Sequence, residues 1–358
     1  MKSATAGLNN DRRAVLSIVN TKGAGLPEDG ELVKDLPLVG PSGEGLTWPN
    51  DVILAADQSA AFVATREGVA VVDMLTLKQF DVDPADETMD IIEVPGGNVQ
   101  KLQLSNDGNW LYVGAGGKIY TVDLRPGSSF YLNHLTPVDL PIPDDVANGG
   151  VINAMEVDAD GDKLYVAVSY GGLFGPDSFN RGDGREGKIF VINVDMNDRT
   201  DDFSPGGDKN WLQVIAELDA FVDPYDITAS SDADKLLFTS RGDLRNGLHR
   251  IFVTDPDPVN FTADVSTLPA VQGNEVGIGA DDPKPLLLNH GRVFAIERTF
   301  KQPAKVGVLN PVYVSVTYPF FSKASPQKYD LDIRHATGVE ITPDMKYAFV
   351  ADYHVSRY

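Results

Sequence analysis

Oxygen-bearing side chains stand at or just before the start of several apolar, strand-like segments of this sequence. The candidates best suited to metal chemistry are Asn50, Asn153 and Asp226. Amide and carboxylate oxygens that converge from distant parts of a chain suit Ca²⁺ and can leave one coordination position for a substrate. The same residue types also cap strands and satisfy backbone groups. Both interpretations are open from the residues alone, and similar positions are occupied by Asp51, Lys101, His290 and His335.

Two copies of Arg-Gly-Asp, the tripeptide that integrins read on matrix proteins, form a second candidate for function. They lie in "DSFNRGDGREGK" (177–188) and "TSRGDLRNG" (239–247). Gly-Asp and Asn-Gly are also what tight hairpin turns require, so integrin binding is disfavoured. Apolar residues in the first segment favour contact with a protein or carbohydrate partner. The predicted binding residues are Leu173, Phe174, Phe179, Arg181, Asp183, Arg241 and Asp243.

Other catalytic and metal-binding patterns are missing from the sequence. There is no nucleophile elbow, phosphate loop or HExxH pattern, and the five histidines show no metal spacing. The absence of cysteine excludes a disulfide scaffold and thiol catalysis. The segment "DADGD" (158–162) has Asp spacing close to that of a calcium loop, but Ser169 stands where an EF-hand needs Glu. A polar turn is therefore predicted there.

The elements that must position these residues repeat along the chain. Five segments of fifteen residues align without gaps, at 51–65, 101–115, 154–168, 226–240 and 338–352. Each combines apolar alternation, a polar turn with Asp at its seventh position, and a β-rich run, which together predict a hairpin. The aligned aspartates are Asp57, Asp107, Asp160, Asp232 and Asp344.

Further strand-like segments follow most hairpins and predict the blades of a β-propeller. Third strands are expected at 68–74, 117–123, 187–193 and 249–255, and fourth strands at 90–95 and 211–218. Four strands per unit describe an all-β propeller of four-stranded blades. One degenerate blade is expected from 284–300 with 311–318, which gives six blades. A seventh would fit if 256–300 held two.

The two ends of the chain are predicted to complete one blade together. Strands at 13–20 and 31–40 would join the C-terminal hairpin 336–358, so that no sheet edge stays open. The expected organisation is an N-terminal arm, 1–12, and a single propeller domain, 13–358.

Composition and charge exclude several classes of function. The net charge of −22 repels phosphate backbones, so no nucleic-acid partner is expected. No run of eighteen apolar residues occurs, so no membrane-spanning segment is expected, and the N-terminus shows no signal peptide. The acidic segment 195–210 is expected to be a solvated excursion, with cation binding as a minor option.

The order "AVLSIVNT…ELVKDLPLVG…WPNDVILAADQSAAFVAT" resembles the YVTN-type repeat of bacterial and archaeal surface propellers and lactonase-like proteins. The "WPND" stretch is also similar to strand entrances in gluconolactonase and senescence-marker propellers. That resemblance implies a divalent cation held by Glu, Asn and Asp from different inner strands. By similarity, Asn153 matches an Asn ligand and Asp226 lies one residue from an Asp ligand. No Glu stands at the first entrance, and Tyr225 occupies a position where a ligand would be expected.

The function expected from these observations is a non-enzymatic binding or scaffold propeller of a larger bacterial protein that is exported or displayed at the cell surface. Its ligand contact is expected on the face where the first strands of the blades begin. The alternative is a lactonase-like hydrolase with Ca²⁺ as its cofactor in the central channel. A quinone or electron-transfer propeller is disfavoured because no haem-attachment motif is present.

Overall fold

The computed structural model describes most of the first two thirds of the chain and a set of separate strands beyond it. The described residues are 14–19, 32–83, 88–146, 150–170, 186–200, 203–222, 224–229, 235–240, 247–267, 275–278, 293–298, 312–317, 327–331, 336–341 and 348–352. They divide into unit 1 (Met1–Pro143 with Asp201–Ser204) and unit 2 (Asp144–Thr200 with Pro205–Tyr358).

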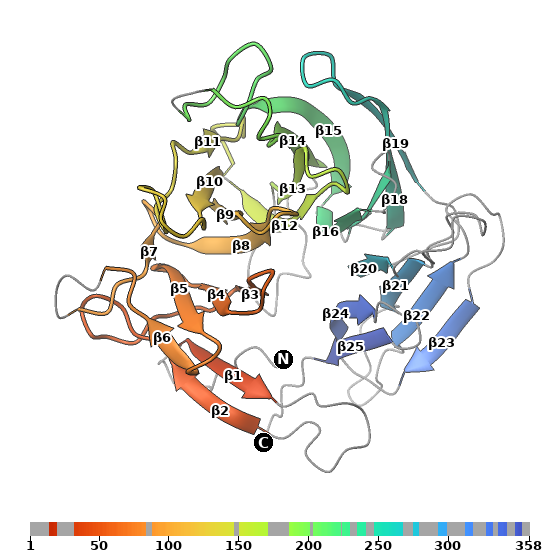
Figure 1. Cartoon of the computed structure of the whole chain (residues 1–358). Helices are drawn as coiled ribbons and strands as arrows, with labels where there is room; N and C mark the ends of the chain where they lie inside the picture. Colours follow the sequence, from red (N-terminus) through yellow and green to blue (C-terminus); the bar gives the residue numbers. More distant parts are fainter. Residues whose placement is uncertain are drawn as a thin grey trace. The chain divides into compact units, whose positions relative to one another are not determined.

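These residues form antiparallel sheets whose strands follow one another in chain order, as Figure 1 shows. A run of separate four-stranded antiparallel sheets of this kind is the architecture of a β-propeller, so the predicted fold class is confirmed. Within the described part of the chain, no helix is long and apolar enough to cross a membrane.

Unit 1 contains the N-terminal hairpin and the first two blades. The N-terminal hairpin consists of β1 (Val15–Val19) and β2 (Leu32–Pro37). Blade 1 consists of β3 (Asp51–Leu54), β4 (Ala60–Ala64), β5 (Gly68–Asp73), β6 (Lys78–Phe80) and β7 (Ile92–Glu93). Blade 2 consists of β8 (Val99–Leu104), β9 (Trp110–Ala115), β10 (Lys118–Asp123) and β11 (Val138–Asp139).

Unit 2 contains blades 3 to 5 and the C-terminal hairpin. Blade 3 consists of β12 (Val151–Val157), β13 (Lys163–Ser169), β14 (Glu186–Asn193) and β15 (Val214–Val222). Blade 4 consists of β16 (Pro224–Ala229), β17 (Lys235–Ser240), β18 (Gly247–Asp255) and β19 (Thr262–Thr267). Blade 5 consists of β20 (Glu275–Ile278), β21 (Val293–Arg298), β22 (Val312–Thr317) and β23 (Gln327–Leu331), and the C-terminal hairpin of β24 (Ala336–Ile341) and β25 (Ala348–Asp352).

The predicted hairpins coincide with the first two strands of blades 1 to 4 and with the C-terminal hairpin. The degenerate blade is confirmed as a single sheet, blade 5, but its first strand, Glu275–Ile278, precedes the predicted segment. The described residues between 256 and 300 therefore contribute the last strand of blade 4 and two strands of blade 5. Pairing of the N-terminal with the C-terminal hairpin, and with it closure of the last blade, stays a prediction.

The outer edge of blade 1 differs from the prediction. Two short strands share the outer edge of β5, because β6 pairs with Val71–Asp73 and β7 pairs with Gly68–Val69. The predicted fourth strand, 90–95, contains β7 only. A tight turn explains β6: the Asp73 carboxylate accepts hydrogen bonds from the backbone N–H groups of Leu75 and Thr76.

The aligned aspartates of the first two blades cap the hairpin turns, as the repeat predicts. The Asp57 carboxylate accepts the Ser59 N–H at 2.9 Å, and the Asp107 carboxylate accepts the Asn109 N–H at 3.0 Å. In blade 3 the equivalent turn is held instead by Asp158, which accepts the N–H groups of Asp162 and Lys163. The turn residues are thus fixed by local hydrogen bonds, which is why a sequence pattern could reveal them.

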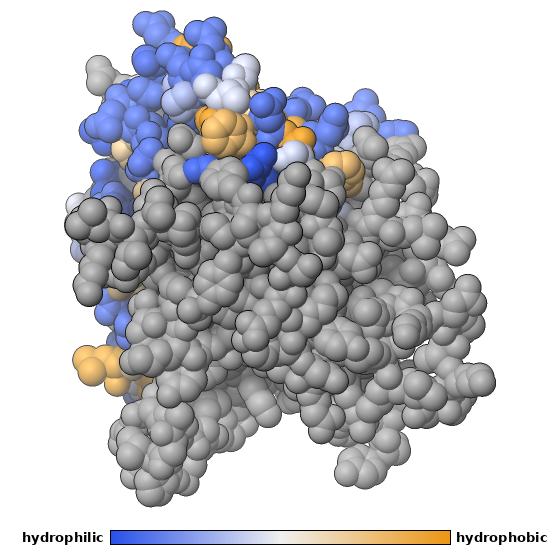
Figure 2. Space-filling model, turned by 90° about the vertical axis from the view of Figure 1, so that its right-hand side faces the viewer, coloured by the Kyte–Doolittle hydropathy of each residue, from blue (hydrophilic) through white to orange (hydrophobic). Residues whose placement is uncertain are grey.

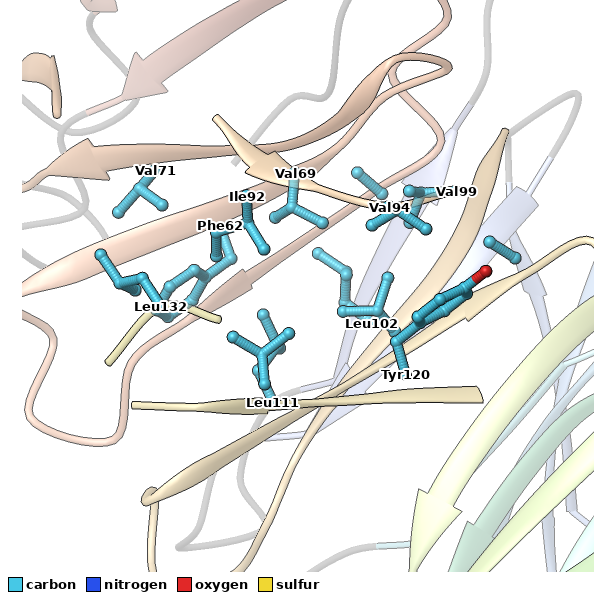
Figure 3. Close-up of a cluster of buried hydrophobic side chains, with 14 residues drawn as sticks. Phe62, Val69, Val71, Ile92, Val94, Val99, Leu102, Leu111, Tyr120 and Leu132 are labelled. Atoms are coloured by element: carbon cyan, nitrogen blue, oxygen red, sulfur yellow. The ribbon is translucent and has the colours of Figure 1, made fainter. Parts of the chain in front are cut away.

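The two middle strands of blade 1, β4 and β5, are buried on both faces, which explains their continuous apolar runs. On β4, Phe62 and Ala64 pack in a core cluster with blade 2, whereas Ala61 and Val63 pack with the N-terminal hairpin. Alternate side chains of a strand point to opposite faces, so one strand supplies two cores. Figure 3 shows the cluster between blades 1 and 2, where Phe62 lies beside Leu132 from the connection after β10. Burying a side chain such as Phe62 contributes about 2–3 kcal/mol.

Blades 3 and 4 pack against each other in the same way within unit 2. Their shared cluster includes Tyr165 from β13, Leu236 and Phe238 from β17, and Ile251 from β18. In the view of Figure 2, most described residues at the surface are hydrophilic, and hydrophobic ones occur among them only in small groups.

Candidate functional site

A backbone bulge marks the start of the first strand in most blades. The pairing register shifts between Val99 and Lys101, between Ile152 and Ala154, between Pro224 and Asp226, and between Ala336 and Gly338. In β3, the Asn50 N–H donates to the Ala64 carbonyl although Asp51 already pairs with Ala64. The bulged residues are Gln100, Asn153, Tyr225 and Thr337, and these four, like Asn50, directly precede the five aligned segments. A bulge changes the direction of the side chain at the bulged residue. The residue before each first strand can therefore point away from its own sheet.

In unit 1, the side chains at this position bind the neighbouring blade. The Asn50 amide donates to the Val99 carbonyl at 2.6 Å. One carboxylate oxygen of Asp51 accepts the Leu102 N–H at 3.0 Å, and the other lies 3.9 Å from the Lys101 ammonium. Because β3 and β8 are edge strands of their own sheets, their outer backbone groups need partners from outside the sheet. Asn50 and Asp51 supply those partners.

Unit 2 repeats this arrangement between blades 3 and 4. The Asn153 amide donates to the Pro224 carbonyl at 2.6 Å, and the Glu156 carboxylate accepts the Ala229 N–H at 3.1 Å. Asp226 accepts the N–H of its own neighbour, Ile227, at 3.0 Å. We call these side-chain hydrogen bonds between first strands the inter-blade latches. Glu156 was not predicted from the sequence, because its role depends on the facing strand of another blade.

The latches bear on the predicted Ca²⁺ site. Asn50 belongs to unit 1, and Asn153 and Asp226 belong to unit 2. Asn153 directs its amide N–H at a backbone carbonyl, and one oxygen of Asp226 accepts a backbone N–H. Among the described residues, no group of three or more His, Asp or Glu side chains is placed to hold a metal ion. Asn153 makes its bond to the backbone carbonyl through its amide nitrogen, whereas a metal would bind the amide oxygen, so a Ca²⁺ site at Asn50, Asn153 and Asp226 stays a prediction.

The predicted binding residues of the two Arg-Gly-Asp loops lie outside the described residues. This applies to Leu173, Phe174, Phe179, Arg181, Asp183, Arg241 and Asp243, and to His290 and His335 among the strand-entrance candidates. Their roles stay predictions.

A buried histidine packs against two aromatic rings near the end of strand β17. The His249 ring, 2% exposed, stacks on Phe221 and Phe238 with centroid distances of 4.2 and 4.8 Å. Its Nε2 shares a hydrogen bond of 2.8 Å with the Ser240 hydroxyl. Burial lowers the pKa of His249 to about 4. The ring is therefore neutral at neutral pH, and it links strands β17 and β18 of blade 4 with β15 of blade 3.

A second polar cluster lies in blade 2, around Asp123 at the end of strand β10. The Arg125 guanidinium donates two hydrogen bonds to the fully buried Asp123 carboxylate, the Arg125 backbone N–H donates a third, and the Ser128 hydroxyl donates a fourth. Burial alone would raise the pKa of Asp123, but these hydrogen bonds hold it below its usual value. The Arg125 guanidinium lies 4.4 Å from the Trp110 ring and 5.5 Å from the Phe203 ring. The expectation of a solvated excursion at 195–210 is therefore wrong for Phe203, which packs in this cluster.

The turn "DADGD" carries several carboxylates but is a turn, as predicted. Burial and the neighbouring Asp195 raise the pKa of Asp162 to about 6, and burial raises the pKa of Asp158. One carboxylate oxygen of Asp158 accepts hydrogen bonds from two backbone N–H groups. Its side chain is thus committed to the hairpin.

Comparisons with known proteins give similarities of fold. No family model matches the chain, and no curated protein sequence matches it. The hydrazine synthase of Kuenenia stuttgartiensis is similar in structure, with a TM-score of 0.54 at 15% identity, over 85% of this chain and 74% of that one. A candidate 6-phosphogluconolactonase from Bacteroides fragilis is similar with a TM-score of 0.52 at 16% identity, over 98% of this chain and 86% of that one. The chain thus resembles lactonase-type propellers in fold, and these low identities show the fold alone.

Proposed function

We propose that this chain is a non-enzymatic binding or scaffold propeller, part of a larger bacterial protein that is exported or displayed at the cell surface. The inter-blade latches carry this proposal. The side chains that the sequence offers as metal ligands hold neighbouring first strands together, at Asn50 in unit 1 and Asn153 in unit 2. Side-chain amides and carboxylates that hydrogen-bond to backbone groups hold the strands in fixed positions. Fixed strands can position the loops that they connect for binding a ligand or partner.

A lactone-hydrolysis assay tests the proposal against a lactonase-like hydrolase that requires Ca²⁺. Purified protein is incubated with gluconolactone-type substrates, with Ca²⁺ or with EGTA, beside the Asp226→Ala variant. We expect no hydrolysis above the uncatalysed rate in any sample. Calcium-dependent turnover that Asp226→Ala abolishes would overturn the proposal and establish the hydrolase.

Export is tested separately in the bacterium that encodes the chain. Surface biotinylation of intact cells, followed by detection with an antibody against this propeller, should label the protein. Labelling only after lysis would contradict the proposed location without affecting the binding role.

A further inference from the structure

The outer edge of blade 3, in unit 2, is formed by one long strand. This strand, β15, has nine residues and is the last strand of its sheet (Figure 1). The blades of unit 1 end differently, because β11 of blade 2 has two residues and the edge of blade 1 is divided between β6 and β7. About half of the backbone N–H and C=O groups of an edge strand point away from its sheet, and such a row of groups can pair with a further strand.

The outward backbone groups and one face of β15 are open to a partner. The backbone of β15 makes its hydrogen bonds with β14 and with no other segment that the structure describes. Between two bulges, Ala216–Asp219 pair in unbroken register with Lys188–Val191. Side chains along this stretch alternate between two faces. Leu218 is buried in the cluster shared by blades 3 and 4, whereas Glu217 and Asp219 are exposed on the opposite face.

The two exposed carboxylates differ in the partners that their own sheet gives them. Asp219 lies opposite Lys188 and accepts a hydrogen bond from its ammonium group at 2.5 Å. Glu217 lies opposite Phe190, which is fully buried and carries no charge. No residue that the structure describes forms a hydrogen bond or an ion pair with the Glu217 side chain. Glu217 is therefore an exposed anion in the middle of an edge strand, with no cation across from it.

A strand added to this edge would place its own side chains beside those of β15. Residues directly opposite each other on one face of a sheet lie about 4.5–5.5 Å apart, so a Lys or Arg of the added strand can pair with Glu217. A second basic residue, two positions along, would lie beside Asp219. The residue between them would lie on the face of Leu218, where an apolar side chain is favoured.

Charge also decides between a basic partner and a second copy of this chain. The net charge of −22 attracts a basic segment and repels an acidic one. Two β15 strands paired edge to edge would bring carboxylates of the two copies together, and like charges opposite each other are destabilising. The edge therefore favours a basic partner over a second copy.

We propose that the outer edge of β15 binds an extended basic peptide segment of a partner protein, which adds a fifth strand to blade 3. This proposal rests on the binding role proposed above and names the chemical class of the partner. Backbone hydrogen bonds supply the affinity, and Lys or Arg residues at alternate positions, beside Glu217 and Asp219, supply the specificity.

Calorimetric titration of the intact chain with synthetic peptides tests this proposal. The peptides are about nine residues long, the length of β15. The first alternates Lys and Val, the second has the same composition with its lysines in one block, and the third alternates Glu and Val. A fourth repeats the first with every backbone nitrogen methylated, so that it cannot donate backbone hydrogen bonds. We expect measurable binding of the first peptide alone. Absence of that binding, or equal binding of the block or methylated peptide, would overturn the proposal.

Two charge-reversal variants locate the binding edge. Glu217→Lys should weaken binding of the alternating Lys–Val peptide about tenfold, because an attractive cross-strand pair becomes a repulsive one. Glu93→Lys makes the same change in net charge at an exposed position of the two-residue strand β7, and it should bind as the wild type does. Equal weakening by both variants would show that net charge alone attracts the peptide and would overturn the proposal.

Hydrogen exchange gives a second, independent measurement of the same edge. Backbone amides of β15 that point outward should exchange more slowly when the alternating Lys–Val peptide is bound, because they then donate to the added strand. Amides of β11, at the edge of blade 2, should exchange at an unchanged rate. Binding without protection of β15 would overturn the proposal.

Failure of this proposal can be told apart from failure of the proposed function. If the alternating Lys–Val peptide does not bind, β15 is not the binding edge, and the propeller can still bind a partner through another surface. Calcium-dependent hydrolysis of a lactone would overturn the non-enzymatic role, whatever β15 binds.

Discussion

Acid should lower the free energy of unfolding through His249. This contribution can be measured separately from those of the other titrating groups. The His249 ring is 2% exposed and packs against Phe221 and Phe238, and burial lowers its pKa from 6.5 to about 4. Above pH 6.5 the histidine is neutral in both states and contributes no pH dependence. As the pH falls from 6.5 toward 4, the unfolded chain binds a proton that the folded chain does not, so the free energy of unfolding falls.

The magnitude follows from these two pKa values. The full effect is about 3 kcal/mol below pH 4, and about 2 kcal/mol is already lost at pH 5.0 relative to pH 7.5. The sequence pI is about 4.5, so pH 5.0 stays on the same side of the isoelectric point as pH 7.5. The free energy of unfolding should be measured by urea denaturation at both pH values, with circular dichroism as the signal.

Two variants isolate the cause. His249→Phe keeps an aromatic ring in the stack and should lose about 2 kcal/mol less than the wild type between pH 7.5 and 5.0, because carboxylate titrations are common to both proteins. Ser240→Ala removes the hydrogen bond to the ring but keeps its burial, so it should retain the wild-type pH dependence. Equal pH dependence in the wild type and His249→Phe would refute the reasoning.

Two further substitutions, one in each unit, test the packing, and a third serves as a control. In unit 1, Arg125→Ala leaves the buried Asp123 carboxylate without its ion pair and should cost about 2–3 kcal/mol of unfolding free energy, less than a fully buried pair because Arg125 is 34% exposed. Lys118→Ala, which breaks an exposed ion pair, should cost under about 1 kcal/mol in the same urea titration, and equal costs would contradict this account. In unit 2, Gly187→Ala would place a Cβ 2.4 Å from Pro224 Cδ, and this overpacking should lower the free energy of unfolding by about 1–3 kcal/mol or more. An unchanged Tm in calorimetry would contradict close packing of the two blades at this position.

The sequence predicts this fold where local rules decide it. Alternating apolar residues and Asp-capped turns identify the hairpins of blades 1 to 4, because both signals lie within about fifteen residues. Asp57 and Asp107 bind the backbone two residues ahead, so their role is visible in the pattern. The divided edge of blade 1 and the early first strand of blade 5 were missed, because short edge strands carry too few alternating residues.

The candidate site was harder to predict because its contacts join residues far apart in the chain. The sequence singled out Asn50 and Asn153, but their partners, Val99 and Pro224, lie 49 and 71 residues away. Nothing in the local pattern shows whether such an amide faces a metal or a backbone carbonyl. His249 was missed for the same reason, since its stacking partner Phe221 comes from another blade.

Differential scanning calorimetry of Asn153→Ala, with Ca²⁺ and with EGTA, tests the central claim that strand-entrance amides hold neighbouring blades together. Loss of the hydrogen bond to the Pro224 carbonyl should cost about 1–3 kcal/mol and lower the Tm equally in both buffers. Asn197→Ala, at an exposed turn of the same unit, should leave the Tm nearly unchanged. If Ca²⁺ instead raises the Tm of the wild type, and Asn153→Ala abolishes that rise, Asn153 is a metal ligand and the account is contradicted.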